Sequence, residues 1–413
     1  MKKCISSFRL CCLISAILYF QTTGAQESRY FPENGQEWER KSPSEVGMDS
    51  LLLAEAISLA KASETANSPN MEINHYQTFG REPFGFGIGP FKERGEQTGI
   101  IVKNGYIVAE WGEPMQVDMT HSITKSFLSS TIGIAYDDGL IKDVHDRVGP
   151  YMAPIFFDES YDLRTRAREI GKPIVFEPFS SEHNEQITWD HLLRQTSDWE
   201  GTLWGKPDWA DRPTGERYEW IDRPRNQPGS TWEYNDVRVN LLALAGTNLF
   251  RQPIQQVLKE RIMDPIGASR TWRWMGYHNS WIILDGKRVQ IPSGGGHWGG
   301  GMFISAYDQA RFGYLTLNHG RWKDLQILSK EWIDMAMKPT DVKDTYGFMN
   351  WFINTDQQLL PSAPASAFYH SGAGVNRVYV DQEHDLVVVL RWIKGSAMDS
   401  IIGKILDSIA DQK

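Results

Sequence analysis

Apolar residues recur at helical spacing in several parts of the chain. In residues 49–63, Leu52, Ala56 and Leu59 fall on one face, and Asp49 stands where its side chain can cap the first turn. We therefore predict a helix there. The same kind of spacing predicts further helices over residues 122–138, 187–195, 237–250, 305–319, 330–337 and 396–412.

Two pairs of β-branched runs predict β-hairpins near opposite ends of the chain. Residues 98–111 hold two such runs around an Asn-Gly pair, which is a strong turn signal. Residues 378–380 and 385–392 form the second pair. We therefore expect an α/β (α+β) fold in which both chain ends build one antiparallel sheet with helices on its faces. A largely helical insert, about residues 140–296, would lie to one side.

The first 25 residues have the pattern of an export signal peptide. Lys2, Lys3 and Arg9 give a basic start, an apolar stretch follows at 11–20, and small residues lead to Ala25, where we expect cleavage. The apolar stretch is too short to span a bilayer comfortably. The mature chain is therefore expected to be periplasmic or extracellular, without a membrane span.

Charge and cysteine content exclude several classes of function. The formal net charge is -9, and it becomes more negative once the leader is removed, so nucleic acid and anionic membrane surfaces are not expected partners. Cys4, Cys11 and Cys12 all lie in the leader. Without them the mature chain has no disulfide, no thiol nucleophile and no cysteine-ligated zinc.

Ser122 and Lys125 form an S-x-x-K pair at the head of a predicted helix. Residues three apart share a helix face, and the helix N-terminus stabilises an alkoxide while it disfavours an ammonium. The stretch 126–135 is small and apolar on nearly every face, which predicts burial and lowers the pKa of Lys125 further. We interpret Lys125 as the base that deprotonates Ser122. The alternative is a chance pair with a solvated lysine, but a buried lysine needs a purpose or a partner.

Tyr234-Asn235-Asp236 follows a Pro-Gly turn and precedes an apolar helix. A tyrosine near a lysine can have a lowered pKa and relay the proton to a leaving group. Asp236 can pair with Lys125 or hydrogen-bond the substrate. In the alternative interpretation, Tyr234 is a packing residue and Asp236 caps the following helix.

The third candidate group is His370-Ser371-Gly372-Ala373-Gly374, directly before a predicted strand. Small residues at a strand edge let a substrate backbone approach, so Ser371 and Gly372 are candidate substrate-binding residues. The backbone N–H groups of Ala373 and Ser122 can form an oxyanion hole. His370 can bind a substrate carboxylate or polarise Tyr234.

In this order the three groups resemble the motifs of the serine β-lactamase and penicillin-binding protein superfamily, nearest to its class C β-lactamase-like branch. Residues 187–197, ITWDHLLRQTS, are similar to the family stretch ITIRHLLTHTSG. The resemblance implies a β-lactamase/transpeptidase-like fold. It makes Ser122 the acylated nucleophile, Lys125 and Tyr234 the acid/base pair, and Ala373 the second oxyanion donor.

The resemblance runs from about Glu45 to the C-terminus. It divides the chain into a signal peptide at 1–25, an N-terminal extension with the first helix at 26–95, and a serine hydrolase domain at 96–413. At three positions this chain departs from the family pattern. Asp236 replaces an asparagine, His370 replaces the lysine of K-T-G, and Asp198 replaces a glycine. A histidine assures no cation at neutral pH, which argues against a β-lactam as the natural substrate.

The stretch 293–301, SGGGHWGGG, has no lysine after its glycines and is not a phosphate loop. We expect a tight crossing near the cleft rim, where His297 and Trp298 are candidates to line the site. His183 and His191 have no third ligand at a useful spacing, so no metal site is predicted.

These observations predict an exported serine hydrolase that cleaves a small ester, amide or peptide-like substrate through an acyl-enzyme, with no metal or organic cofactor. An ester or peptide-like amide ranks above a β-lactam. The alternative is a penicillin- or muropeptide-binding protein of the same fold that does not turn over, because both need the same motifs. The sequence indicates no particular oligomeric state.

Overall fold

The computed structural model describes residues 29–34, 37–157, 175–213, 215–216, 219, 221 and 223–409. The expected signal peptide lies outside the described residues, as do the last residues of the expected C-terminal helix. None of the helices among the described residues has both the length and the apolar character that a bilayer crossing requires.

Both ends of the described chain build one antiparallel sheet, as the two hairpins predicted. The β1–β2 and β15–β16 hairpins lie next to each other because β1 pairs with β16, with Ile101 opposite Val388. The strand order is β13 (Trp351–Ile353), β14 (Phe368–Gly372), β15 (Asn376–Asp381), β16 (Leu386–Arg391), β1 (Thr98–Lys103) and β2 (Tyr106–Trp111).

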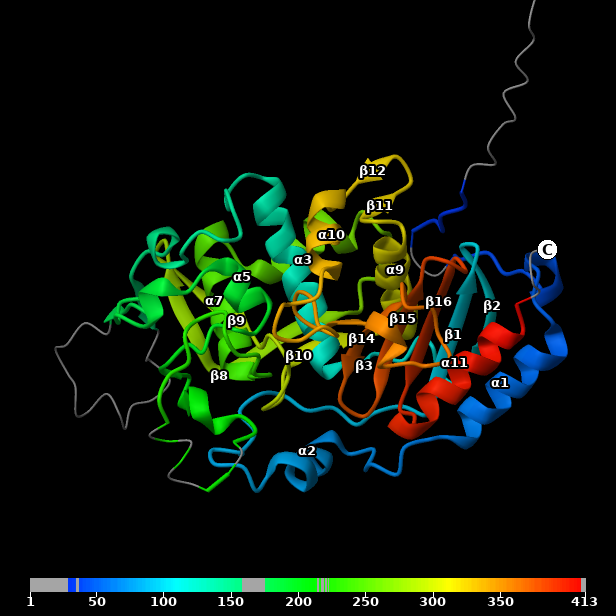
Figure 1. Ribbon diagram of the computed structural model, residues 1–413, viewed down its shortest axis with the longest axis horizontal. Coiled ribbons are helices and arrows are strands. Elements are labelled where there is room, and N and C mark those ends of the chain that lie inside the picture. Colours follow the sequence, from blue (N-terminus) through cyan, green and yellow to red (C-terminus); the bar gives the residue numbers. More distant parts are fainter. Residues whose placement is uncertain are drawn as a thin grey trace, which may run out of the picture.

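Helices cover both faces of this sheet (Figure 1). Ile101 and Val388 belong to an apolar cluster with α1 (Ser50–Ala62) and α11 (Met398–Asp407). Their neighbours Ile100 and Val387 point the other way and join the cluster that contains α9 (Ala306–Leu317). The alternation follows from the two-residue repeat of a strand, and it leaves the central strands buried on both faces.

The region between the two halves of the sheet contains the expected helices and also a second sheet that sequence reasoning missed. Its long hairpin, β8–β9, lies in residues predicted to hold only short helices and loops. Polar and charged side chains alternate irregularly there, so the strands gave no clear two-residue pattern. The strand order is β3 (Asp118–Met119), β10 (Gly301–Ile304), β8 (Arg273–Leu284), β4 (Ile155–Phe157) and β5 (Val175–Phe176), with β9 (Lys287–Pro292) beside β8.

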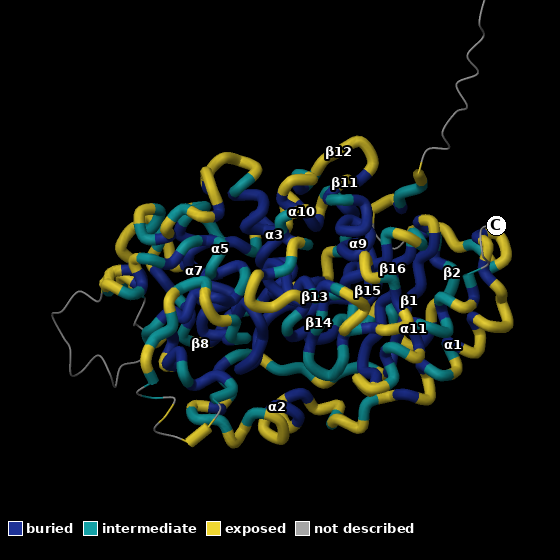
Figure 2. The backbone as a smooth tube through the Cα atoms, viewed as in Figure 1, coloured by how far each residue is buried: buried dark blue, intermediate teal, exposed yellow. Residues whose placement is uncertain are grey.

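Helix α3 (Thr124–Asp137) runs through the middle of the molecule between the sheet and the helical region (Figure 1), and its residues are buried from Thr124 to Ala135 (Figure 2). The helix ends at Asp137, and Gly139 follows with a φ of 72°, the left-handed conformation expected of a glycine just after a helix. The other helices are α2 (Met71–Phe79), α5 (Trp189–Leu193), α7 (Asp236–Phe250), α8 (Ile254–Leu258) with a π-helical continuation (Lys259–Met263), and α10 (Lys330–Met337).

Short elements connect these parts. They include two small hairpins, β6 (Thr202–Leu203) with β7 (Lys206–Pro207) and β11 (Arg321–Trp322) with β12 (Leu325–Gln326). The 3-10 helices are η1 (Pro43–Val46), η2 (His121–Ile123), η3 (Gly149–Tyr151), η5 (Asn184–Gln186), η6 (Asp208–Ala210), η8 (Thr355–Gln357) and η9 (Gly395–Ala397).

Residues 71–95, which we call the N-terminal strap, cross from the first helix to the helical region and begin with α2. Ile88 N–H and Gly89 N–H both donate to Trp298 O, at 3.0 and 2.9 Å. Lys206 Nζ donates to Phe84 O and, at 2.8 Å, to Phe86 O. The strap is therefore tied to residues 293–301, which we call the glycine-rich loop, and to β7.

Candidate active site

Ser122 lies in the 3-10 turn η2 directly before α3, so the α-helix that was predicted to begin at Ser122 begins two residues later, at Thr124. His121, directly before it, has φ 50°, so the chain turns sharply at the nucleophile. Thr124 Oγ1 donates to His121 O at 2.5 Å and accepts from Met302 N–H at 2.9 Å. The turn is thereby held against β10, with the Ser122 side chain partly exposed.

Lys125 lies in the first turn of α3 and its side chain is fully buried. Its Nζ donates to Ser122 Oγ at 2.8 Å and lies 4.5 Å from the centroid of the Tyr234 ring. Burial lowers the pKa of Lys125 below its usual value, while the charge of Asp236 opposes that shift. The distance and the direction of the pKa shift both suit a general base for Ser122.

Asp236 pairs with Lys125, as one interpretation of the sequence proposed. Its Oδ1 lies 2.7 Å from Lys125 Nζ, and both side chains are fully buried. The capping role considered for Asp236 belongs instead to Asn235, whose Oδ1 accepts from Val237 N–H and Arg238 N–H at 3.0 and 3.3 Å. Asp236 is the first residue of α7.

Gly295 of the glycine-rich loop packs directly over this ion pair. A Cβ atom at Gly295 would overlap Lys125 Nζ and the Asp236 carboxylate. The glycine is required here by close approach, and its backbone excludes water from one side of the pair. This close approach strengthens the ion pair, because low dielectric increases the attraction between the two charges.

Tyr234 lies in the loop before α7, where its hydroxyl lies near Ser122 and donates to Asn350 Oδ1 at 2.9 Å. The expectation of a lowered tyrosine pKa is corrected. Desolvation, followed by the negative charge of Asp236, raises the pKa of Tyr234 well above its usual value. We therefore interpret Tyr234 as a neutral proton donor and relay, and Lys125 as the base of the pair.

The end of β14, at Gly372, packs against the backbone at the start of η2, the turn that holds Ser122 and that we call the nucleophile turn. A Cβ atom at Gly372 would collide with Thr120 O, two residues before Ser122. Ala373 then opens the tight turn to β15, in which Asn376 Nδ2 donates to Ala373 O at 2.8 Å. Gly372 therefore lies against the backbone just before Ser122, and the N–H of the next residue, Ala373, stays the predicted second oxyanion donor. Ser371 is partly exposed on this strand.

His370 does not face the cleft, and its expected contact with substrate is corrected. The side chain is 0% exposed and packs against Trp351, with ring centroids 4.8 Å apart, and against Phe312, at 5.3 Å. Burial lowers the pKa of His370 to about 3. A neutral, enclosed imidazole holds no substrate carboxylate, so His370 is a packing residue between the sheet and α9.

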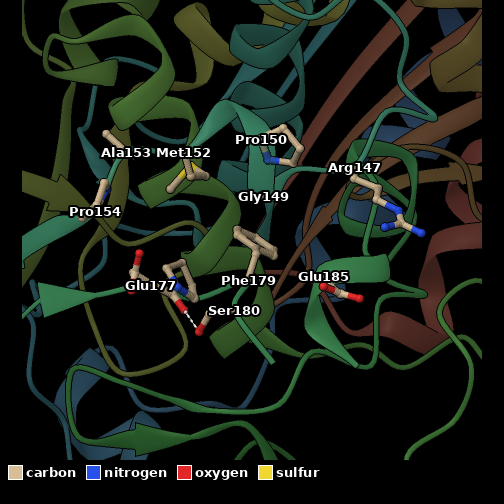
Figure 3. A pocket seen from close by; sticks show the side chains of 11 residues that line it. Arg147, Gly149, Pro150, Met152, Ala153, Pro154, Glu177, Phe179, Ser180 and Glu185 are labelled. Atoms are coloured by element: carbon tan, nitrogen blue, oxygen red, sulfur yellow. Dashed lines mark hydrogen bonds between the residues drawn. The ribbon is translucent and has the colours of Figure 1, made fainter. Parts of the chain in front are cut away.

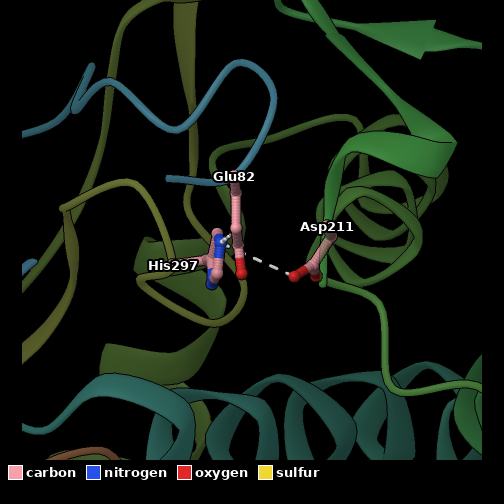
Figure 4. A group of neighbouring side chains, drawn as sticks. All are labelled: Glu82, Asp211 and His297. Carbon is pink, nitrogen blue, oxygen red and sulfur yellow. Dashed lines mark hydrogen bonds and ion pairs between the residues drawn. The ribbon is translucent and has the colours of Figure 1, made fainter. Parts of the chain in front are cut away.

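The glycine-rich loop also places its two aromatic residues differently from the prediction. Trp298 is fully buried, with Lys206 Nζ 5.0 Å from its ring centroid. His297 is buried beside the site. Its Nε2 lies 2.7 Å from Glu82 Oε2 of the strap and 3.5 Å from Asp211 Oδ1 (Figure 4). Both residues therefore support the wall of the site from behind and do not line an open cleft.

Glu82, Asp211 and His297 have the side chains of a metal site, with one ligand atom of each within 4.8 Å of the others. However, both Asp211 oxygens already accept hydrogen bonds, one from the Arg212 guanidinium and the other from Asp236 N–H. The neighbouring Arg212 charge also disfavours a cation. We interpret the group as a hydrogen-bonded link between strap, loop and helix. Burial raises the pKa of Asp211 to about 6, against the opposing effect of Arg212.

Sequence reasoning missed two residues that contact Tyr234. The Arg212 guanidinium lies 5.2 Å from the Tyr234 ring centroid, and Asn350 accepts from its hydroxyl. Both come from segments without a recognisable motif, so no signal in the sequence could have found them. Arg212 also lines, with Arg81 and Glu82 of the strap, a cavity of about 710 Å³ that adjoins the site.

A second cavity, of about 280 Å³, lies in the helical insert and is unrelated to this chemistry. Arg147, Pro150 and Phe179 are among its lining residues, together with Glu177 and Glu185 (Figure 3). None of the residues around Ser122 lines it. The only hydrogen bond drawn among its lining residues is Ser180 Oγ to Glu177 O, at 2.9 Å. Among the described residues that line this cavity, the Ser180 hydroxyl is thus held by a backbone carbonyl oxygen.

Comparison with known proteins identifies the family. Residues 94–392 match the model of a family described as Beta-lactamase, and this range includes Ser122, Lys125 and Tyr234. The chain belongs to the beta-lactamase family. The superfamily resemblance deduced from the three motifs is thereby confirmed, whereas the class C-like branch stays a prediction.

One curated relative is a protein of Escherichia coli O157:H7 with the provisional name D-alanyl-D-alanine carboxypeptidase. It is 24% identical over 211 residues, which are 43% of this chain and 48% of that protein. The chain thus spans about half the length of the curated relative that it matches.

Solved structures confirm the β-lactamase/transpeptidase-like fold. A provisionally named beta-lactamase from Bacteroides dorei DSM 17855 has a TM-score of 0.51 at 15% identity, covering 75% of this chain and 93% of that one. A family VIII carboxylesterase has a TM-score of 0.51 at 15% identity, covering 88% and 98%. At these identities the likeness concerns the fold, and the substrate has to be argued from the site.

Proposed function

We propose that this beta-lactamase-family protein is an exported serine hydrolase that cleaves a small ester or peptide-like amide through an acyl-enzyme on Ser122. The observation that carries the proposal is the 2.8 Å hydrogen bond from buried Lys125 Nζ to Ser122 Oγ, beside the Tyr234 hydroxyl. A nucleophile, a base with a lowered pKa and a proton donor thus meet at one partly exposed oxygen.

The reaction follows from this geometry. Ser122 Oγ bonds to the substrate carbonyl carbon while its proton passes to the neutral Lys125 amine. The resulting oxyanion lies between the N–H groups of Ser122 and Ala373. The bond to the leaving oxygen or nitrogen then breaks as Tyr234 donates its proton, which the Lys125 ammonium replaces. Water, deprotonated by the same lysine, attacks the acyl carbon and frees Ser122.

Burial of His370 and the ion pair at Asp236 support an ester or peptide-like amide over a β-lactam. A β-lactam carries a carboxylate that needs a cation, but His370 is neutral because burial lowers its pKa. The ammonium group of Lys125 is already paired with the Asp236 carboxylate. The relatives agree in part, since one is named a carboxylesterase and another a D-alanyl-D-alanine carboxypeptidase. Export rests on the composition of residues 1–25 alone.

A second candidate is a penicillin- or muropeptide-binding protein of the same fold that acylates once and turns over too slowly to matter. The 2.7 Å ion pair between Lys125 and Asp236 favours it, because a carboxylate this close keeps the lysine charged for more of the time. A charged lysine cannot deprotonate the water needed for deacylation.

Steady-state assays of the purified mature protein separate the two candidates. We expect continued release of p-nitrophenol from p-nitrophenyl acetate and weaker activity on the β-lactam nitrocefin, with both lost in Ser122→Ala. Mass spectrometry should show a fluorophosphonate adduct on Ser122. A single burst without turnover would support the binding protein, and full activity in Ser122→Ala would refute both.

A further inference from the structure

A chain of hydrogen bonds connects Tyr234, which lies beside the base of the site, to strand β14 through Asn350. Lys125 Nζ donates to Ser122 Oγ at 2.8 Å and lies 4.5 Å from the centroid of the Tyr234 ring. Tyr234 Oη donates to Asn350 Oδ1 at 2.9 Å, and Asn350 Nδ2 donates to Ser371 O. The chain therefore ends at a carbonyl two residues before Ala373.

The direction of these hydrogen bonds is fixed by chemistry. Ser371 O can only accept, so the amide nitrogen of Asn350 faces the strand and the amide oxygen faces Tyr234. An amide oxygen can only accept too, so Tyr234 must donate its hydrogen to it. The lone pairs of Tyr234 Oη are then left to face Ser122.

Asn350 is itself held rigidly. It is 0% exposed, and its φ of 66° lies in the left-handed region, which asparagine tolerates better than most residues. Its backbone N–H donates to Tyr346 Oη at 2.7 Å, and Tyr346 Oη also accepts from Gln195 Nε2 at 2.6 Å. Gln195 Oε1 accepts from Asn235 N–H at 2.8 Å. The network thus closes on the residue next to Tyr234.

We propose that Asn350 is a positioning residue, which fixes the Tyr234 hydroxyl beside Ser122 and couples it to strand β14, directly before the proposed oxyanion donor Ala373. This inference rests on the proposed serine hydrolase function. With its hydrogen held by Asn350, Tyr234 cannot become the base, and the Ser122 proton goes to Lys125. Protonation of the leaving group requires the tyrosine hydrogen to turn away from Asn350, so this hydrogen bond opens in each turnover.

The test is a double-mutant cycle between Asn350 and Tyr234. Glycine accommodates a φ of 66° without strain, so Asn350→Gly removes the side chain and leaves the backbone conformation available. We expect it to slow fluorophosphonate labelling of Ser122 by roughly tenfold, the effect of one buried hydrogen bond to a reacting group. In the Tyr234→Phe background it should have no further effect, because no hydroxyl remains to be positioned.

Asn350→Asp provides a second readout that loss of packing would not give. The carboxylate accepts from Tyr234 but adds a negative charge near Lys125, so the acidic limb of the kcat/KM profile should move to higher pH. Asn354→Ala is the matched control. That asparagine is also fully buried and donates to the carbonyl oxygens of Leu360 and Pro364, at 3.0 and 2.9 Å, but it has no contact with Tyr234 among its hydrogen bonds. It should lower the melting temperature and leave the pH profile unchanged.

The outcomes distinguish this inference from the function on which it rests. An equal loss of labelling rate in Asn350→Gly with and without the Tyr234 hydroxyl overturns the positioning role, while a labelled wild type still supports the hydrolase. A wild type that is never labelled on Ser122 refutes the hydrolase, and the positioning role with it. Coupling between the two positions, with the pH shift in Asn350→Asp, supports the proposal.

Discussion

At the scale of single residues, the unusual feature of the site is a carboxylate 2.7 Å from Lys125, the lysine that we propose as the base. Burial lowers the pKa of Lys125 and Asp236 raises it, so the two effects oppose each other. The fraction of neutral lysine, and with it the rate, depends on their balance. An asparagine at this position, as in the family motif, would remove the largest effect that opposes burial.

Asp236→Asn should therefore move the acidic limb of the kcat/KM profile to lower pH by about one to three units. Removing the negative charge lowers the pKa of Lys125, so the lysine stays neutral, and active as a base, in more acidic solution. The measurement is hydrolysis of p-nitrophenyl acetate against pH. Asp138→Asn, which removes an exposed partner of Arg261, is the control. An unmoved limb in a folded Asp236→Asn protein would contradict the role assigned to the ion pair.

At the scale of elements, sequence reasoning succeeded where a pattern repeats and failed where contact is made between distant segments. The helices at α1, α7 and α9 follow from spacing and from caps such as Asp49 and Ser305, which accept from the first-turn N–H groups. The hairpin β8–β9 was missed because its polar positions hide the two-residue repeat.

The site shows the same division. Ser122, Lys125 and Tyr234 were found because motifs mark them. Asn350 and Arg212 reach Tyr234 only after the chain has folded, and no local pattern marks either residue. The burial of His370 could not be predicted from the sequence either, because it depends on the packing of α9 and β13 against β14.

The glycine-rich loop makes a prediction at this scale. Gly295→Ala should reduce kcat/KM by about a hundredfold or more, since the new methyl group displaces Lys125 or Asp236 by a distance of ångström order. Gly149→Ala is a matched control, because a Cβ there meets only ordinary contacts at 3.4 Å or more. Both variants should be compared by esterase kinetics and circular dichroism. Normal activity in Gly295→Ala would contradict this prediction, because it would mean that the loop moves enough to accommodate the methyl group.

At the scale of the whole molecule, one apolar cluster runs from the six-stranded sheet through α3 into the helical region. The nucleophile turn, α7 and β14 are therefore fixed to the same core, which keeps the reacting groups at constant separation. Enclosing titratable groups in this core has an energetic cost, since a buried histidine cannot bind a proton without losing its hydration.

His370 should make the protein less stable in acid. The unfolded chain binds this proton below pH 6.5, but burial holds the folded pKa at about 3, so between these values only the unfolded state takes it up. The free energy of unfolding falls by about 1.4 kcal/mol per pH unit from this group as the pH drops through that window. In urea unfolding, the free energy of unfolding of His370→Phe should fall less steeply with decreasing pH than that of the wild type. The variant His145→Gln, at an exposed position, should keep the wild-type slope. Parallel slopes for wild type and His370→Phe would contradict the assignment.

The N-terminal strap has a practical consequence for anyone expressing part of this gene product. A fragment begun at residue 94, where the family match starts, would contain every catalytic motif and still lack one wall of its cleft. Trp298 would lose its cover, its carbonyl would lose two donors, and the amine of Lys206 would face solvent in place of the Phe84 and Phe86 carbonyl oxygens. Boundaries for such fragments are better set upstream of α1 than by homology.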